Sequence, residues 1–415
     1  MKIALTIPTG RPRVKQVVKA FIDNAIFHGH DPKNFAVYLS IDTLFNRTRT
    51  RDYKLPVNLE RSLGKVEYIS PGSRKLIGDE LINRLDADPK LVNSLFVGRG
   101  YSRQRNSALL SALKDGNDFA ICFDDDEAPS IPLRSEDSSI RWINPNFFGP
   151  HITSLLEGAD ITRGPCLGYL SPIPSDIEKE VPERIRRRLG EALNPGNEVI
   201  NEDSFLDLMG RINYLPEDEF YNNSRPYVVE ENKHGKPILS GNMGINLKSV
   251  RKGKVPIFYT PPNARGEDTF FALQLKDSNV VEVPSYIFHD PFTIYSQVLE
   301  SRYPRELKHI PITTASKNRF ADAVIGWIKY APLLIHMTSE DPIEREERIG
   351  EMMAKIEAPT KKLAEILGCP QLNTCKKVLE QYQEDVLGHY DTLLRSQLLW
   401  REKILPAYVP TSVLV

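Results

Sequence analysis

The sequence has few cysteines, no long apolar run and almost no net charge, and each of these absences excludes a class of protein. Its four cysteines form no C-x-x-C pair, so neither a structural zinc site nor a disulfide framework is expected. No stretch approaches the roughly 18–20 apolar residues that a membrane helix needs, since the best candidate, residues 323–337, contains Lys329 and Pro332. With 54 Lys and Arg residues against 55 Asp and Glu residues, the chain lacks the basic excess of a dedicated nucleic-acid binder.

The N-terminal segment and the length of the chain indicate a folded protein of more than one domain. The apolar start is too short for the core of a secretory signal, because Pro8 and basic residues follow at once. We therefore expect a cytoplasmic protein without a transmembrane segment. A length of 415 residues predicts two or three domains and a sizeable core.

Residues 1–125 alternate short β-type runs with helical patterns, which predicts a mostly parallel sheet with crossover helices. The predicted strands lie at 3–7, 35–41, 66–69 and 118–123, and the predicted helices at 14–25 and 102–114. The last of these strands is apolar throughout its interior, as expected of a strand that is covered on both faces. The fold class predicted for this part of the chain is therefore α/β.

The composition and the pattern of the sequence change twice after the predicted sheet. Residues 171–236 are rich in proline and charge, including the arginines of 184–188, which predicts a loop-rich insertion. Compact structure resumes at 237–247, with a helix at 266–277 and a strand at 280–283. Beyond 312 the pattern is helical, with segments at 316–336, 342–367 and 371–404. We therefore predict an α/β domain over 1–311 and a helical domain over 312–415.

The sharpest local feature is the run Asp124-Asp125-Asp126-Glu127, directly after the apolar strand. Four adjacent carboxylates repel one another, so a fold that gathers them at a strand end usually neutralises them with a cation. On an extended segment Asp124 and Asp126 point the same way and can converge on one ion. An acidic turn without a ligand is the alternative interpretation.

Two further features carry side chains of the same chemistry. Glu267 and Asp268 open a predicted helix, where acidic residues also complement the helix dipole without any functional role. His289 follows an apolar stretch and precedes Asp290 and Pro291. A lone histidine is often structural, but histidine is also a common ligand of divalent ions.

In this order, the features resemble the GT-A family of nucleotide-sugar-dependent glycosyltransferases over residues 1–295. The resemblance implies a GT-A fold with a mostly parallel central sheet, and it assigns roles to positions of the chain. The implied donor-binding residues are Pro8, Thr9, Gly10 and Arg11 in the first loop, Asp42 at the base or ribose, Arg103, Arg105 and Asn106 at a helix start, Asp124 and Asp125 in the D-x-D motif, and Gly241 and Asn242 in a later loop.

The resemblance also implies a chemistry. It implies a Mn²⁺ or Mg²⁺ ion held by Asp124, Asp126 and His289, with Asp124 reaching the ion or the ribose through water. Asp268 is implied as the general base and Glu267 as the residue that orients the acceptor. The donor is a nucleotide-diphosphate sugar, with UDP ranked before GDP, and the acceptor is a hydroxyl of a glycan, a small metabolite, a protein, a lipid-linked sugar or a modified nucleic-acid base.

Two other functions stay open at this point. A nucleotidyltransferase that forms sugar nucleotides would need a glycine-rich phosphate loop, and the segment 9–13 is glycine-poor. A non-catalytic scaffold would use the C-terminal helices for assembly and keep the acidic run as a structural turn. For an enzyme, the same helices are expected to form a homo-oligomer, cap the acceptor site or rest on a membrane surface.

Overall fold

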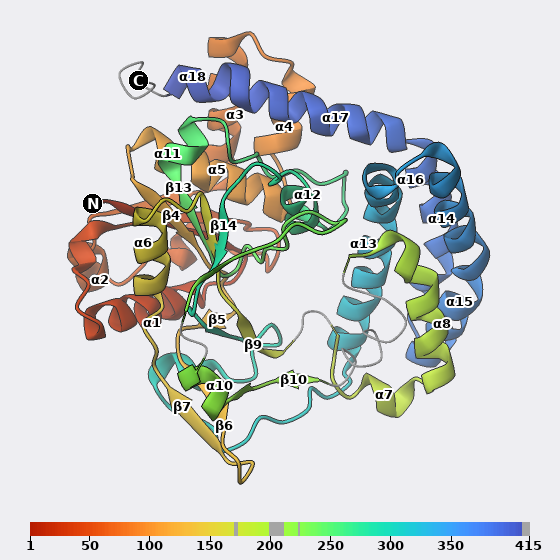
Figure 1. Ribbon diagram of the computed structural model, residues 1–415, viewed down its shortest axis with the longest axis horizontal. Coiled ribbons are helices and arrows are strands. Elements are labelled where there is room, and N and C mark those ends of the chain that lie inside the picture. Colours follow the sequence, from red (N-terminus) through yellow and green to blue (C-terminus); the bar gives the residue numbers. More distant parts are fainter. Residues whose placement is uncertain (170–172, 199–210, 223–224, 409–415) are drawn as a thin grey trace.

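The computed structural model describes residues 1–169, 173–198, 211–222 and 225–408. A large twisted sheet with helices on both faces occupies one side of the molecule, and upright C-terminal helices stand on the other (Figure 1). The mixed α/β class, the mostly parallel sheet and the helical C-terminal region are confirmed. The proposed boundary between 311 and 312 stays a prediction, and part of the 171–236 insertion lies outside the described residues.

Within the described residues, the main sheet has eight strands in the order β12-β14-β8-β13-β4-β1-β2-β3. Their bounds are β1 Ile3–Thr9, β2 Phe35–Ile41, β3 Lys65–Ile69, β4 Phe119–Cys122, β8 Ile161–Arg163, β12 Tyr227–Val228, β13 Met243–Asn246 and β14 Val280–Glu282. The ladder from β3 through β2 and β1 to β4 is parallel, whereas β13 runs antiparallel to both β4 and β8. The loops that follow β1 and β4 therefore lie side by side at one edge.

Strand β1 explains why this half folds as a layered sheet. All of its residues are buried, and alternate side chains face opposite layers. Ile3, Leu5 and Ile7 join the apolar cluster that contains α1, while Ala4 joins the cluster that contains α5. The helices of the first layer are α1 Val14–Phe27, α2 Val57–Ser62 and α6 Phe148–Leu156, and those of the second are α3 Pro71–Leu85, α4 Pro89–Phe96, α5 Tyr101–Lys114, α11 Leu247–Arg251 and α12 Glu267–Ala272.

Two smaller sheets lie below the main one and connect the acidic segment to His289. The described strands of the first follow the order β10-β9-β15-β5, and those of the second β11-β6-β7. Their bounds are β5 Glu127–Ala128, β6 Ile131–Arg134, β7 Ile140–Ile143, β9 Cys166–Tyr169, β10 Ile212–Asn213, β11 Leu215–Pro216 and β15 Ile287–His289, with the short helix α10 Glu217–Asn222 beside them. Because β15 pairs with β5 in the register His289 to Glu127, the sheet fixes His289 next to the carboxylates.

The C-terminal helices form an apolar cluster of their own, and helices from the insertion complete it. Residues of α7 and α8 pack in one cluster with α13 to α16. The bounds are α7 Ile177–Glu180, α8 Glu183–Leu193, α13 Thr314–Thr338, α14 Pro342–Lys355, α15 Glu357–Leu367, α16 Cys375–Glu384, α17 Val386–Leu398 and α18 Leu405–Tyr408. Helices α17 and α18 return across the sheet half over α3 and α4 (Figure 1), where Arg395 pairs with Asp88 at 2.7 Å. In the part of the chain that the structure describes, no helix is long and apolar enough to cross a membrane.

Candidate functional site

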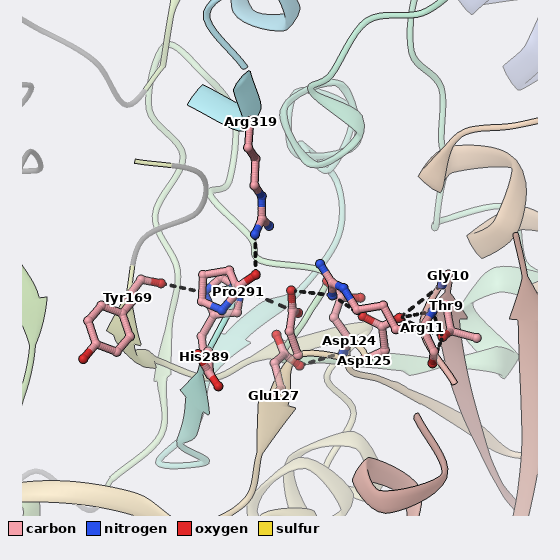
Figure 2. A network of polar contacts seen from close by, with 12 residues as sticks. Thr9, Gly10, Arg11, Asp124, Asp125, Glu127, Tyr169, His289, Pro291 and Arg319 are labelled. Carbon is pink, nitrogen blue, oxygen red and sulfur yellow. Dashed lines mark hydrogen bonds and ion pairs between the residues drawn. The ribbon is translucent and has the colours of Figure 1, made fainter. Parts of the chain in front are cut away.

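The acidic segment leaves β4 at the edge of the sheet where β1 also ends, and its second residue organises the neighbouring loop. Asp125 Oδ2 accepts hydrogen bonds from Thr9 Oγ1 at 2.7 Å, from the Gly10 amide at 3.1 Å and from the Arg11 amide at 3.2 Å. Its other oxygen pairs with the Arg11 guanidinium. Asp125 is therefore turned inward, where it shapes the predicted nucleotide-binding loop (Figure 2).

Asp124 faces a different partner. Arg105, on the buried side of α5, donates to both Asp124 oxygens at 2.9 and 3.1 Å. The same guanidinium donates to the Ser240 carbonyl at 3.2 Å and so joins the loop before β13 to the acidic segment. Gly241 follows, and a Cβ at this position would overlap Glu127 Oε1. This loop therefore approaches the carboxylates closely only because glycine lacks a side chain.

Asp126 and His289 face each other across a short gap. Asp126 Oδ1 lies 3.7 Å from His289 Nε2, and Asp126 Oδ2 accepts a hydrogen bond from Arg11 Nη1 at 2.9 Å. His289 Nδ1 lies 2.7 Å from the Tyr169 carbonyl, so this nitrogen carries the proton. When the ring is neutral, Nε2 directs a lone pair toward Asp126 Oδ1. A proton or a cation between these two atoms would then bind both of them.

The segment turns at Asp125 and Asp126, so the alternation expected of an extended chain does not apply. Asp124 pairs with Arg105, whereas Asp126 faces His289, so the two carboxylates engage different partners. Among the residues that the structure describes, no three His, Cys, Asp or Glu side chains are gathered closely enough to hold a metal ion by themselves. Asp126 and His289 are thus two possible ligands of an ion whose other ligands would come from substrate or water.

Burial is the main influence on the pKa values of the acidic segment. Burial raises the pKa of Asp124 to about 6, against the opposing effect of Arg105, and burial also raises the pKa of Asp125 and Glu127. Burial acts in the same direction on Asp126, yet His289 when its ring is protonated, Arg11 and Arg319 lower the pKa of Asp126 to about 2. Asp126 is the carboxylate of this segment that stays ionised most readily, as a metal ligand must.

Glu267 and Asp268 lie at the start of α12 and belong to the same site. The Ser240 amide donates to Asp268 Oδ2 at 3.2 Å, which places this carboxylate beside the loop that Arg105 holds. Asp268 Oδ1 and Ser240 Oγ are both buried and have no hydrogen-bond partner within the described residues. Buried polar atoms are seldom left unpaired, so these two are available to a ligand hydroxyl or to water.

The loop after β2 lies beside the loop after β1, because the Asp42 amide donates to the Thr9 carbonyl at 2.7 Å, and it carries the predicted base or ribose contact, Asp42. Asp42 Oδ1 accepts from the Leu44 amide at 2.9 Å, and Asp42 Oδ2 lies 3.3 Å from Arg99 Nε. Phe45, whose side chain is 48% exposed, packs on Gly10 and lies 5.4 Å below the Arg11 guanidinium. Neither Phe45 nor Arg99 was predicted from the sequence, because an aromatic residue and an arginine in a polar loop carry no motif.

Several predicted donor-binding residues make their contacts elsewhere. Arg103 donates to the Ser94 carbonyl, Asn106 to the Leu95 and Phe258 carbonyls, and Asn242 to the Pro165 and Ser285 carbonyls. Pro8 is a buried residue of β1. These contacts and the burial of Pro8 give the four residues roles in holding the fold, and their contact with a nucleotide sugar stays a prediction.

Comparisons of sequence and of structure give different results for this chain. It matches no protein-family model and no curated protein. Among solved structures, it is similar to the structure described as "Crystal structure of S. aureus TarS 1-349", with a TM-score of 0.36 and 11% identical residues over 94% of this chain and 91% of that one. A match of this strength establishes neither family nor activity.

Proposed function

We propose that the protein is a metal-dependent glycosyltransferase that moves a sugar from a nucleotide-diphosphate sugar to a hydroxyl acceptor. The observation that carries the proposal is the pair Asp126 and His289, two acceptor atoms 3.7 Å apart at the end of a parallel strand. The carboxyl ends of such strands are where ligands bind in open α/β sheets. A second carboxylate, Asp268, lies across the same loop with one buried oxygen unpaired.

The residues present fit a divalent ion in part. Asp126 supplies an ionised carboxylate and His289 a ring nitrogen whose partner nitrogen is already fixed by a carbonyl. Asp124 is held by Arg105, so we assign it an outer position rather than direct ligation. Mn²⁺ or Mg²⁺ bound here would stabilise the charge of the departing diphosphate.

The polar side chains near Asp126 support an assignment of residues to the groups of the donor. Arg11 presents a guanidinium at the Asp126 side and has its backbone amide fixed by Asp125, which suits a phosphate. Asp42 and Phe45 lie beyond this loop and suit the ribose and the base of a nucleoside, with UDP ranked before GDP. The acceptor remains any of the hydroxyl compounds named above.

Asp268 is the proposed general base, with Glu267 as the residue that orients the acceptor. A base must accept a proton from the attacking hydroxyl, and Asp268 Oδ1 is the oxygen that no described residue occupies. The Ser240 amide holds the other oxygen, so the carboxylate is fixed while Oδ1 keeps its capacity to accept a proton. In an enzyme that retains the configuration of the sugar, Asp268 would instead position the acceptor.

Calorimetric titration with UDP and GDP, each with Mn²⁺ and with excess chelator, tests this proposal. We expect micromolar binding of one nucleotide that is lost on chelation, and we expect Asp126→Ala to abolish it. The matched control is Asp137→Ala, which removes an exposed carboxylate from the loop between β6 and β7. Metal-independent binding, or unchanged binding by Asp126→Ala, would remove Asp126 from the metal site. Binding of neither nucleotide under any condition would favour the scaffold function.

A further inference from the structure

The first turns of α13 reach the site from the C-terminal helical region. The Arg319 guanidinium donates to the Pro291 carbonyl and lies 5.1 Å from the centre of the Phe292 ring. Figure 2 shows this side chain extending from its helix toward the loop that carries His289. The Asp290 amide in turn donates to the Asp126 carbonyl at 2.8 Å. One loop thus connects Arg319 to the proposed metal ligands.

Arg319 also belongs to the electrostatic environment of the site. Its charge is one of those that lower the pKa of Asp126, while burial and the charges of Arg11 and Arg265 lower the pKa of Arg319 itself. The positive charges of Arg319, Arg11 and Arg265 therefore act at one place, beside the Asp126 carboxylate, and a diphosphate that binds there with a divalent ion would lie within reach of all three. A diphosphate carries the charge and the oxygen atoms that such groups bind.

The same helix fixes the opposite side of the site. The ring of Tyr330 packs against Gly266, where a Cβ would lie 3.0 Å from the ring, and Gly266 immediately precedes Glu267 and Asp268. Tyr330 OH donates to Glu198 Oε2 at 2.9 Å. Residues 319 and 330 lie about 16 Å apart along a helix, so α13 spans the site from the His289 loop to the proposed base.

We propose that Arg319 binds the terminal phosphate of the nucleoside diphosphate, which makes α13 a part of the donor site. This inference rests on the proposed function and goes beyond it, because it assigns a substrate contact to the C-terminal helices. The guanidinium donates to the Pro291 carbonyl and remains charged at every relevant pH. Its charge compensates the charge that develops on the diphosphate as the bond to the sugar breaks.

The experiment compares nucleoside diphosphates with monophosphates in the presence of Mn²⁺. For Arg319→Ala we expect the affinity for UDP to fall roughly 10- to 100-fold, the size expected for a lost charge-assisted hydrogen bond, while UMP binding changes less than about twofold. Arg319→Lys retains the charge without the fork and should lie between the two. The matched control is Lys317→Ala on the same helix, whose ammonium pairs with Glu180 at 2.7 Å and should leave both affinities unchanged.

Each outcome decides the question. Equal losses for UDP and UMP would overturn the phosphate contact and give Arg319 a purely structural role, as would unchanged UDP binding by Arg319→Ala. A thermal unfolding midpoint for Arg319→Lys equal to that of the unmodified protein would show that its loss of affinity is local. If GDP is the nucleotide bound, GDP and GMP replace the uridine pair. If the unmodified protein binds no nucleotide, the proposed function itself fails, and the Arg319 assignment with it.

Discussion

Gly168 offers a test of how tightly the strand that carries His289 is held. Its φ is +90°, and a Cβ at this position would lie 2.7 Å from both the His289 carbonyl oxygen and the Phe288 ring. The left-handed backbone costs an alanine about 1–2 kcal/mol, and overpacking against β15 costs about 1–3 kcal/mol more. Gly168→Ala should therefore lower the free energy of unfolding by roughly 2–5 kcal/mol.

Two other glycines separate the two contributions. Gly158 has a φ of +104° but has no atom within 4 Å of a built Cβ, so Gly158→Ala should lose only the backbone contribution, about 1–2 kcal/mol. Gly350 lies in α14 with open space around it and an ordinary φ, so Gly350→Ala should stabilise by about 0.5–1 kcal/mol. The packing contribution at β15 is the difference in the free energy of unfolding between Gly168→Ala and Gly158→Ala.

Urea denaturation and nucleotide titration measure the series. From the highest urea midpoint to the lowest, we expect the order Gly350→Ala, the unmodified protein, Gly158→Ala and Gly168→Ala. Because the clash falls on the backbone of His289, only Gly168→Ala should also weaken Mn²⁺-dependent nucleotide binding. Equal midpoints for Gly168→Ala and Gly158→Ala would refute the argument, since they would show that β15 moves aside without cost and does not fix His289.

Three further predictions follow from the contacts of the site. Asp268→Asn should retain nucleotide binding but lose sugar transfer by roughly 10²–10⁴-fold, whereas near-normal turnover would remove it as the base. His151 hydrogen-bonds Asn242 at 2.9 Å, and burial lowers the pKa of His151 to about 4. The contribution of the neutral His151 ring to the free energy of unfolding is therefore complete above pH 6.5 and is lost as the pH falls from 6.5 to 4. The free energy of unfolding should fall by about 3 kcal/mol over this pH range. The denaturation midpoint of His151→Gln should not show this fall. Arg105→Met, which leaves Asp124 unpaired in a largely buried position, should destabilise by roughly 3 kcal/mol in the same assay, and an unchanged midpoint would show that water already solvates this carboxylate.

The parallel core was predictable because its strands are apolar runs bounded by breakers. The predicted strand at 35–41 coincides with β2, and the strands at 3–7 and 118–123 correspond to β1 and β4. Helix α3 was not predicted, because its buried residues include Arg74 and Gly78 and give no apolar stripe. The predicted helix at 342–367 is divided at Ile356 into α14 and α15. Pro359, in the first turn of α15, has no N–H to bond to the Lys355 carbonyl and so interrupts the helix there, a signal that the sequence interpretation missed.

The candidate site was predictable where its residues form a motif within one element. It was not predictable where the tertiary fold determines which cation each carboxylate pairs with. The position of Asp124–Glu127 after a strand indicated a candidate site, and in the structure Arg105 pairs with Asp124 and Asp268 accepts from the adjoining Ser240 amide. Which carboxylate pairs with which cation depends on a turn at Asp125, and a sequence pattern does not encode that turn. Arg319 carried no sequence signal, because a charged residue in the first turns of an amphipathic helix is usually solvated.

The contacts of α13 also bear on how separable the two halves of the chain are. The predicted domain boundary at 311 would place the whole of α13 outside the α/β half, yet Arg319 contacts Pro291 and Tyr330 packs against Gly266. Removal of the C-terminal helices would therefore withdraw a cation from the Asp126 side and the support from the start of α12. Self-association through these helices stays a prediction, but their contacts with both sides of the site require that any assembly they form leave α13 in place.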